Sequence, residues 1–164
     1  MPKLYLLLGG NLGDRQLYLA QARVRIAAQV GTITRSSSLY ETAAWGKTDQ
    51  PAFLNQVLEV QAEQAPEQVL LTVNMIEQEL GRVRQEHWGA RVIDIDILFY
   101  DDLAMQTQRL TIPHPQLHLR RFTLLPLAEL APDLVHPVLG KSITALLEAC
   151  PDELEVREFM KDNS

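Results

Sequence analysis

Hydrophobic and polar positions along the chain alternate in blocks that predict four main strands and two main helices. Apolar runs and two-residue alternation predict the strands, at residues 4–8, 33–40, 53–61 and 91–100. Apolar positions at helical spacing predict helices at 15–30 and 66–80. A short strand near Leu110 and helical segments at 122–130 and 143–150 follow, and the tail after Pro151 receives no assignment beyond a frayed end.

The order of these elements is strand, helix, strand, strand, helix, strand. This is the order of the split βαβ, ferredoxin-like arrangement, an α+β fold. We expect a mainly antiparallel sheet with helices packed on one face, and an outer strand at 33–40. No linker, internal repeat or low-complexity tract interrupts the chain, so a single domain spanning 1–164 is predicted.

Composition narrows the classes of function. The net charge of −6 argues against a general nucleic-acid binder, and no apolar run approaches the length of a membrane span. The N-terminal residues lack the pattern of a secretory signal. The one cysteine, Cys150, cannot form a disulfide within the chain. We therefore expect a cytoplasmic protein.

The strand at 91–100 carries two acidic side chains on one face. The α-carbons of Asp94 and Asp96 would be about 6.6 Å apart, because side chains alternate along a strand. Paired carboxylates suit Mg²⁺, which typically takes one or two of them together with substrate phosphates, and two ions are also possible. A solvated acidic face is the alternative. The opposite face is predicted to hold Ile93, Ile95, Ile97 and Phe99.

Arginines are concentrated in one part of this acidic chain. Six of the eleven lie between Arg82 and Arg121, where there is no lysine. Guanidinium groups match phosphate and carboxylate oxygens, so a local anion site is one interpretation. Surface ion pairs with nearby acidic residues are the other.

Some residues suit a flat ring. Phe53 and Asn55 are expected on one face of their strand, where a ring beside an amide would fit a planar heterocycle with donor and acceptor edges. Trp45 and Phe122 would extend this slot. Packing in the core is the alternative for each aromatic residue.

Two loops give less specific indications of function. His114 lies between two prolines and would contact an anion or serve packing. The glycine-rich turn from Gly9 to Gly13 has neither the Gly-Lys-Ser/Thr ending nor the G-x-G-x-x-G spacing of nucleotide loops. If ATP binds, arginines and metal must hold its phosphates.

A series of short segments runs along the chain in one order. It comprises Gly9-Gly10-Asn11-Leu12-Gly13-Asp14, Ser38-Leu39-Tyr40-Glu41-Thr42, Phe53-Leu54-Asn55, Gly81-Arg82-Val83-Arg84, Trp88-Gly89-Ala90-Arg91, Asp94-Ile95-Asp96-Ile97-Leu98, Pro113-His114-Pro115 and Arg120-Arg121-Phe122. Together they resemble the 6-hydroxymethyl-7,8-dihydropterin pyrophosphokinase family, although no single segment is specific.

The resemblance implies an enzyme of folate biosynthesis that transfers pyrophosphate from ATP to the pterin hydroxymethyl group and releases AMP. It implies that Asp94 and Asp96 bind two Mg²⁺ ions and that Arg82 and Arg91 assist the transfer. ATP-binding positions map to Glu77, Arg84, Trp88, Arg91, Ile97, Arg109, Thr111, His114 and Arg120. Pterin-binding positions map to Thr42, Ala43, Trp45, Phe53, Asn55 and Phe122.

Two other classes of function stay open. A metal-dependent phosphoesterase or nucleotidyltransferase would use the same aspartate pair without an aromatic slot. A non-catalytic ferredoxin-like binding module would leave the aspartates as a solvated face. In the preferred interpretation the partners are small molecules, with no nucleic acid and no membrane, and the protein is a monomer.

Overall fold

An antiparallel sheet organises the part of the chain that the computed structural model describes, residues 1–43, 52–81 and 92–159. In these residues the sheet has six strands, and every pair is antiparallel. The strand order is β5 (Asp94–Tyr100), β1 (Lys3–Gly10), β4 (Phe53–Ala62), β3 (Tyr40–Thr42) and β8 (Val156–Glu158), with β2 (Gly31–Ser36) paired to the other end of β4.

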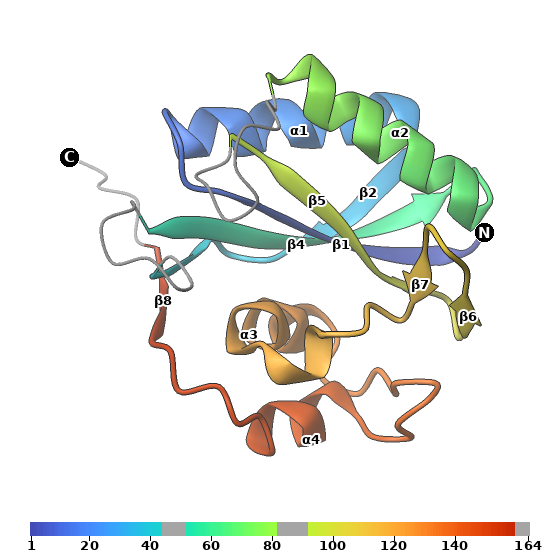
Figure 1. Cartoon of the computed structure of the whole chain (residues 1–164), viewed down its shortest axis with the longest axis vertical. Coiled ribbons are helices and arrows are strands. Elements are labelled where there is room, and N and C mark those ends of the chain that lie inside the picture. The colour runs from blue at the N-terminus through green and yellow to red at the C-terminus, as the bar shows by residue number, and fades with distance from the viewer. Residues whose placement is uncertain (44–51, 82–91, 160–164) are drawn as a thin grey trace.

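Helices cover both faces of this sheet (Figure 1). One face carries α1 (Arg15–Gln29) and α2 (Pro66–Glu79), and the other carries α3 (Arg121–Leu130) and α4 (Ile143–Glu148). A short 3₁₀ turn at Leu117–Leu119 precedes α3. The chain order β1-α1-β2-β4-α2-β5, with β1 between β4 and β5, is the predicted split βαβ arrangement.

The expectation that helices occupy one face is correct for α1 and α2 and wrong for the rest. Side chains of β1 alternate, so Leu4, Leu6 and Leu8 pack with α1 and α2. Tyr5 and Leu7 point the other way and pack with α3 and α4. A strand buried on both faces is apolar without interruption, which explains the unbroken run at the start of the chain.

Local signals explain where the two long helices begin and where α2 ends. The carboxylate of Asp14 accepts a hydrogen bond from the N–H of Leu17 (3.1 Å) and caps α1. Pro66 occupies the first turn of α2, where no N–H is needed. Gly81 follows α2 with a φ of 95°, a left-handed conformation that glycine adopts without strain.

The predicted outer strand at 33–40 is two strands. β2 ends at Ser36 and β3 begins at Tyr40. Between them the N–H of Ser37 donates to the carbonyl of Val57 (2.9 Å), and the hydroxyl of Ser37, in place of a backbone carbonyl, accepts from the N–H of Val57 (3.0 Å). β3 is not an outer strand, since β8 pairs with it. The tail after Pro151 is therefore not simply frayed.

The strand β5 starts at Asp94, three residues later than predicted, and contains a β-bulge. Leu6 of β1 is opposite Ile97 and Tyr5 is opposite Phe99, so Leu98 is an extra residue. The bulge reverses the alternation beyond it. Phe99 therefore packs with α3 and α4, and its predicted place beside the isoleucines is wrong.

The remaining secondary structure lies after β5. β6 (Met105–Gln106) and β7 (Thr111–Ile112) form a small hairpin, of which β7 matches the strand expected near Leu110. Within the described ranges, no helix combines the length and the apolar character needed to cross a bilayer.

We predict that Leu127→Ala lowers the free energy of unfolding by about 2–5 kcal/mol, because it leaves a cavity where α3 meets the sheet. Leu127 is fully buried in the second core. Urea denaturation followed by circular dichroism measures the loss. Leu71→Ala on α2, where Leu71 is 51% exposed, is the control and should change stability by less than about 0.5 kcal/mol. Equal small losses in both variants would mean that α3 is not integral to the fold.

Candidate active site

The floor of the main cleft forms where β1 pairs with β4 and β5 at the same level. Gly9 of β1 is opposite Asn55 of β4 on one side and Asp94 of β5 on the other. Since neighbouring strands are about 4.8 Å apart, the backbones of Asn55 and Asp94 are separated by about 10 Å. All three residues line a cleft of about 820 Å³. An amide and a carboxylate thus face the same space across a residue that has no side chain.

Close approach of the Asn55 side chain requires glycine at position 9. A β-carbon on Gly9 would lie 2.5 Å from Asn55 Oδ1, closer than such atoms come in proteins. Asn55 is 3% exposed, and its Nδ2 has no hydrogen-bond partner among the described residues. A buried donor without a partner is costly, so Nδ2 is suited to donate to an acceptor on a ligand in the cleft.

The paired aspartates lie on β5 as the alternation predicts. Asp94 and Asp96 are half-buried and line the cleft, while Ile93, which precedes them, and Ile95, which lies between them, are in the core. Two carboxylates are what a Mg²⁺ ion typically takes when substrate phosphates complete its coordination. The described ranges contain no group of three or more His, Cys, Asp or Glu that could hold a metal.

Two aromatic side chains line the same cleft as Asn55. Phe53 of β4 is opposite Thr42 of β3, and both line the cleft together with Ala43. Phe122 at the start of α3 also lines it, and the Arg120 guanidinium carbon lies 5.6 Å from the centre of the Phe122 ring. The structure thus brings two rings and one amide into a single cleft.

Glu77 lines the cleft and also forms a hydrogen bond to the backbone of β5. It lies on α2, is 4% exposed, and its Oε2 accepts a hydrogen bond from the backbone N–H of Ile95 (2.8 Å). This bond fixes the segment of β5 between Asp94 and Asp96. Glu77 therefore has a structural contact in addition to its predicted place in the ATP site.

His114 lies in the loop that follows β7. Its backbone N–H donates to the carbonyl of Leu98 (3.0 Å), and its Nδ1 accepts from the N–H of Gln116 (3.1 Å). Burial, and secondarily the charge of Arg120, lower the pKa of His114 to about 4. The ring is therefore neutral near pH 7 and carries its proton on Nε2, which makes Nε2 a hydrogen-bond donor.

All of the predicted site residues that the structure describes line this one cleft. They are Thr42, Ala43, Phe53, Asn55, Glu77, Asp94, Asp96, Ile97, Arg109, Thr111, His114, Arg120 and Phe122. The predictions for Trp45, Arg82, Arg84, Trp88 and Arg91 fall outside the described residues. The role of each residue stays a prediction.

The cleft also has lining residues that the sequence analysis missed. Asn74 and Leu70 precede Glu77 by three and seven positions on α2, so helical spacing from Glu77 would have found them. Gln108 lies beside Arg109 between β6 and β7, which no periodicity marks. Leu154 comes from the tail, and no signal in the sequence places it there.

Comparison with protein families then decides the relationship. The model of the 7,8-dihydro-6-hydroxymethylpterin-pyrophosphokinase (HPPK) family matches residues 5–132. The chain belongs to this family. The match ends just after α3, so α4 and β8 lie beyond the part that the family model covers.

Curated relatives in the HPPK family are similar over most of their length. A 2-amino-4-hydroxy-6-hydroxymethyldihydropteridine pyrophosphokinase of Methylorubrum extorquens is 45% identical over 136 residues, 82% of this chain and 86% of the relative. The protein of the same name from Aquifex aeolicus is 40% identical over 143 residues, 87% of this chain and 89% of the relative.

A solved structure supports the fold. The wild-type Plasmodium falciparum HPPK-DHPS crystal structure with pteroate matches with a TM-score of 0.73 at 19% identity. The match covers 90% of this chain but only 42% of that longer chain. At this identity the likeness shows the fold alone.

We predict that acid destabilises the protein partly through His114. The unfolded chain binds a proton at this residue below pH about 6.5 and the folded protein only below about 4, so stability falls as pH drops between these values. His114→Asn keeps an acceptor near the position of Nδ1 but cannot titrate. Between pH about 7.5 and 5, its free energy of unfolding should fall by about 1–2 kcal/mol less than that of the wild type, measured by urea denaturation.

The pKa of His136 is also lowered, by burial and then by His118, so the wild type has a second acid-sensitive group. Comparing wild type with His114→Asn at each pH cancels that contribution. Identical pH dependence in the two proteins would contradict the burial of His114 as a neutral ring.

Proposed function

We propose that this chain transfers pyrophosphate from ATP to the hydroxymethyl group of 6-hydroxymethyl-7,8-dihydropterin and releases AMP, a step of folate biosynthesis. Membership of the HPPK family and the names of the curated relatives support this reaction. The observation that carries the proposal is the pairing of Gly9 on β1 with Asn55 on β4 and with Asp94 on β5. This pairing places an amide donor that has no partner among the described residues and a carboxylate in one cleft. This spacing is compatible with a two-ring heterocycle held by the amide, with its alcohol arm directed to the carboxylates.

In the proposed reaction the substrate hydroxyl oxygen attacks the β-phosphorus of ATP. The new bond joins that oxygen to the β-phosphorus, the bond from the β-phosphorus to the bridging oxygen of AMP breaks, and the hydroxyl proton is released. Asp94 and Asp96 would hold Mg²⁺, two ions in our proposal, since hard carboxylate oxygens beside a phosphate site fit that metal. Bound Mg²⁺ would neutralise phosphate charge and favour deprotonation of the alcohol.

The amide end of the cleft would bind the pterin. Asn55 Nδ2 would donate to a ring acceptor, and the rings of Phe53 and Phe122 would contact the faces of the heterocycle. Thr42 and Ala43 line the same end and would contribute backbone polar groups, with Trp45 beside them in the sequence.

Other residues that line the cleft would hold the triphosphate. Arg109, Arg120 and the Nε2–H of His114 are donors in the cleft that suit phosphate oxygens. Glu77, Ile97 and Thr111 are the other described positions assigned to ATP. The further ATP contacts proposed from the sequence are Arg82, Arg84, Trp88 and Arg91, of which Arg82 and Arg91 would stabilise charge in the transition state.

The proposal includes the cellular location and the oligomeric state of the enzyme. We infer that it acts in the cytoplasm as a monomer on two small-molecule substrates. A metal-dependent phosphoesterase is the main rival, because it would use the same aspartates. It would release its product without any pterin, and that difference decides between the two reactions.

We predict that Asp96→Asn lowers AMP formation at least about a hundredfold, because it removes half of the carboxylate pair while keeping the size of the side chain. AMP is measured from ATP by chromatography, with pterin and Mg²⁺ each present or omitted. Wild-type protein should form AMP only when both are present. Asp102→Asn, in the exposed turn after β5, is the matched control and should keep full activity.

Other outcomes of this assay would overturn the proposal. ADP instead of AMP, or AMP formation that does not depend on pterin, would favour another phosphoryl-transfer reaction. Undiminished activity in Asp96→Asn would remove the aspartate pair from the mechanism.

We also predict that Asn55→Asp weakens pterin binding about tenfold to a hundredfold, because it replaces the buried Nδ2 donor by an acceptor of the same shape. ATP affinity should change less than about twofold. Both affinities can be measured by isothermal titration calorimetry. Gln61→Glu, an exposed amide on the same strand, is the control for the added charge. Equal weakening of ATP and pterin binding would show that Asn55 only supports the fold.

A further inference from the structure

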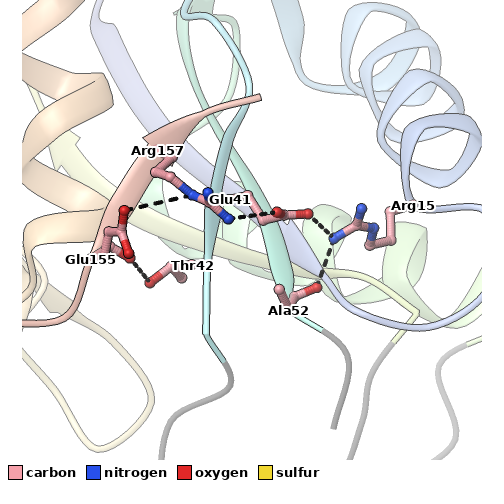
Figure 2. Close-up of polar contacts among 6 residues, drawn as sticks. All are labelled: Arg15, Glu41, Thr42, Ala52, Glu155 and Arg157. Carbon is pink, nitrogen blue, oxygen red and sulfur yellow. Dashed lines mark hydrogen bonds and ion pairs between the residues drawn. The ribbon is translucent and has the colours of Figure 1, made fainter. Parts of the chain in front are cut away.

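Arg15 connects two chain segments that border the cleft. Its Nη1 donates to Oε2 of Glu41 (2.8 Å) and to the backbone carbonyl of Ala52 (2.9 Å), as Figure 2 shows. Glu41 lies in the middle of β3, and Ala52 immediately precedes β4. One guanidinium therefore holds both the strand that leads into the segment 43–52 and the residue at its far end.

These two attachment points adjoin residues that line the cleft. Thr42 and Ala43 follow Glu41 directly, and Phe53 follows Ala52. Thr42 is opposite Phe53 in the ladder, so a shift of either strand would move the two residues relative to each other. Arg15 itself does not line the cleft, and its hydrogen bonds are to Glu41 and Ala52, the neighbours of these residues.

The surroundings of Arg15 strengthen its interactions. The side chains of Arg15 and Glu41 are 23% and 25% exposed, and the Phe159 ring lies 5.6 Å from the guanidinium carbon of Arg15. Partial burial reduces screening by water, so this pair is worth more than an exposed one. Hydrogen bonds that involve a charged group are also stronger than neutral ones.

Arg157 offers an internal comparison. It approaches the same carboxylate from β8, at 3.9 Å, but its side chain is 69% exposed, and its other ion pair, at 3.8 Å, is with Glu155 (Figure 2). Such a pair contributes little. Two arginines thus face Glu41, and only Arg15 also binds the carbonyl of Ala52.

We propose that Arg15 is a positioning residue for the pterin end of the cleft. By holding Glu41 and the Ala52 carbonyl together, it fixes Thr42, Ala43 and Phe53 in the places from which they contact the heterocycle. This inference rests on the proposed function, and it assigns a role in substrate affinity to a residue on α1 that does not touch the substrate.

The test is the affinity for 6-hydroxymethyl-7,8-dihydropterin of an Arg15→Met variant, in the presence of Mg²⁺ and a non-hydrolysable ATP analogue. We expect the dissociation constant for the pterin to rise about tenfold, while that for the ATP analogue changes less than about twofold. In steady-state assays the KM for pterin should rise more than kcat falls. A residue that only stabilises the fold would lower the active fraction and leave both affinities unchanged.

Two matched variants isolate the bridge. Arg157→Met removes the other cation that faces Glu41, and Arg25→Met removes a different ion pair of α1, with Glu79. Both should leave the pterin affinity within about twofold of wild type. Equal weakening in Arg157→Met would show that charge near Glu41 matters and that the bridge to Ala52 does not.

Arg15→Lys is the conservative variant. Its single ammonium keeps the charge and can still donate to these acceptors, so it should recover part of the lost affinity. If Arg15→Met fails to fold, Glu41→Gln answers the same question, because it weakens one half of the bridge and should raise the pterin dissociation constant by a smaller factor. Unchanged pterin affinity in the folded variants would overturn the inference. Failure of the wild type to bind pterin would instead overturn the proposed function.

Discussion

The register of β1 between β4 and β5 is the constraint on which the arrangement of the cleft depends. Because β1 pairs with both neighbours at Gly9, the side chains of Asn55 and Asp94 lie on the same face of the sheet and at the same level. A slip of one residue on either side would turn one of them toward the helices on the opposite face. Burial on both faces of β1 makes such a slip costly, since every leucine of the strand would change its environment.

The helical layers on the two faces contribute different parts of the cleft. Glu77 comes from α2 on one face and fixes the backbone of β5, whereas Phe122 comes from α3 on the other (Figure 1). The cleft is therefore built from both cores. The network around Arg15 adds α1 and the C-terminal strand β8, so segments from the beginning and the end of the chain meet at β3 (Figure 2).

Much of the fold could be predicted from the sequence because its long elements carry clear periodicity. The helices α1 and α2 and the strand β4 start and end within about two residues of their predicted bounds, where proline, glycine and a capping aspartate mark the ends. The bulge at Leu98 could not be predicted, since an extra residue in one strand is defined only by its partner. Nor could β8, because the polar segment Val156–Glu158 forms a strand only where β3 offers it hydrogen bonds.

The chemistry of the cleft was predictable where unusual residue types recur at strand spacing, as with Asp94 and Asp96. Contacts in the cleft that depend on the packing of several strands could not be predicted from the sequence. Glycine is needed at position 9 because of the Asn55 side chain, which belongs to a strand more than forty residues later in the sequence. The contact between Arg15 and Ala52 likewise joins distant segments that no local pattern relates.

The contact between Glu77 and Ile95 has a consequence for the behaviour of the protein in concentrated solution. β5 is an outer strand of the described sheet, and outer strands with unpaired N–H groups can recruit a strand from another molecule. The Glu77 carboxylate accepts a hydrogen bond from the N–H of Ile95, near the start of the strand that carries the aspartates. Glu77, a residue predicted to contact ATP, therefore also occupies one of the N–H groups that a strand of another molecule would need for pairing with β5.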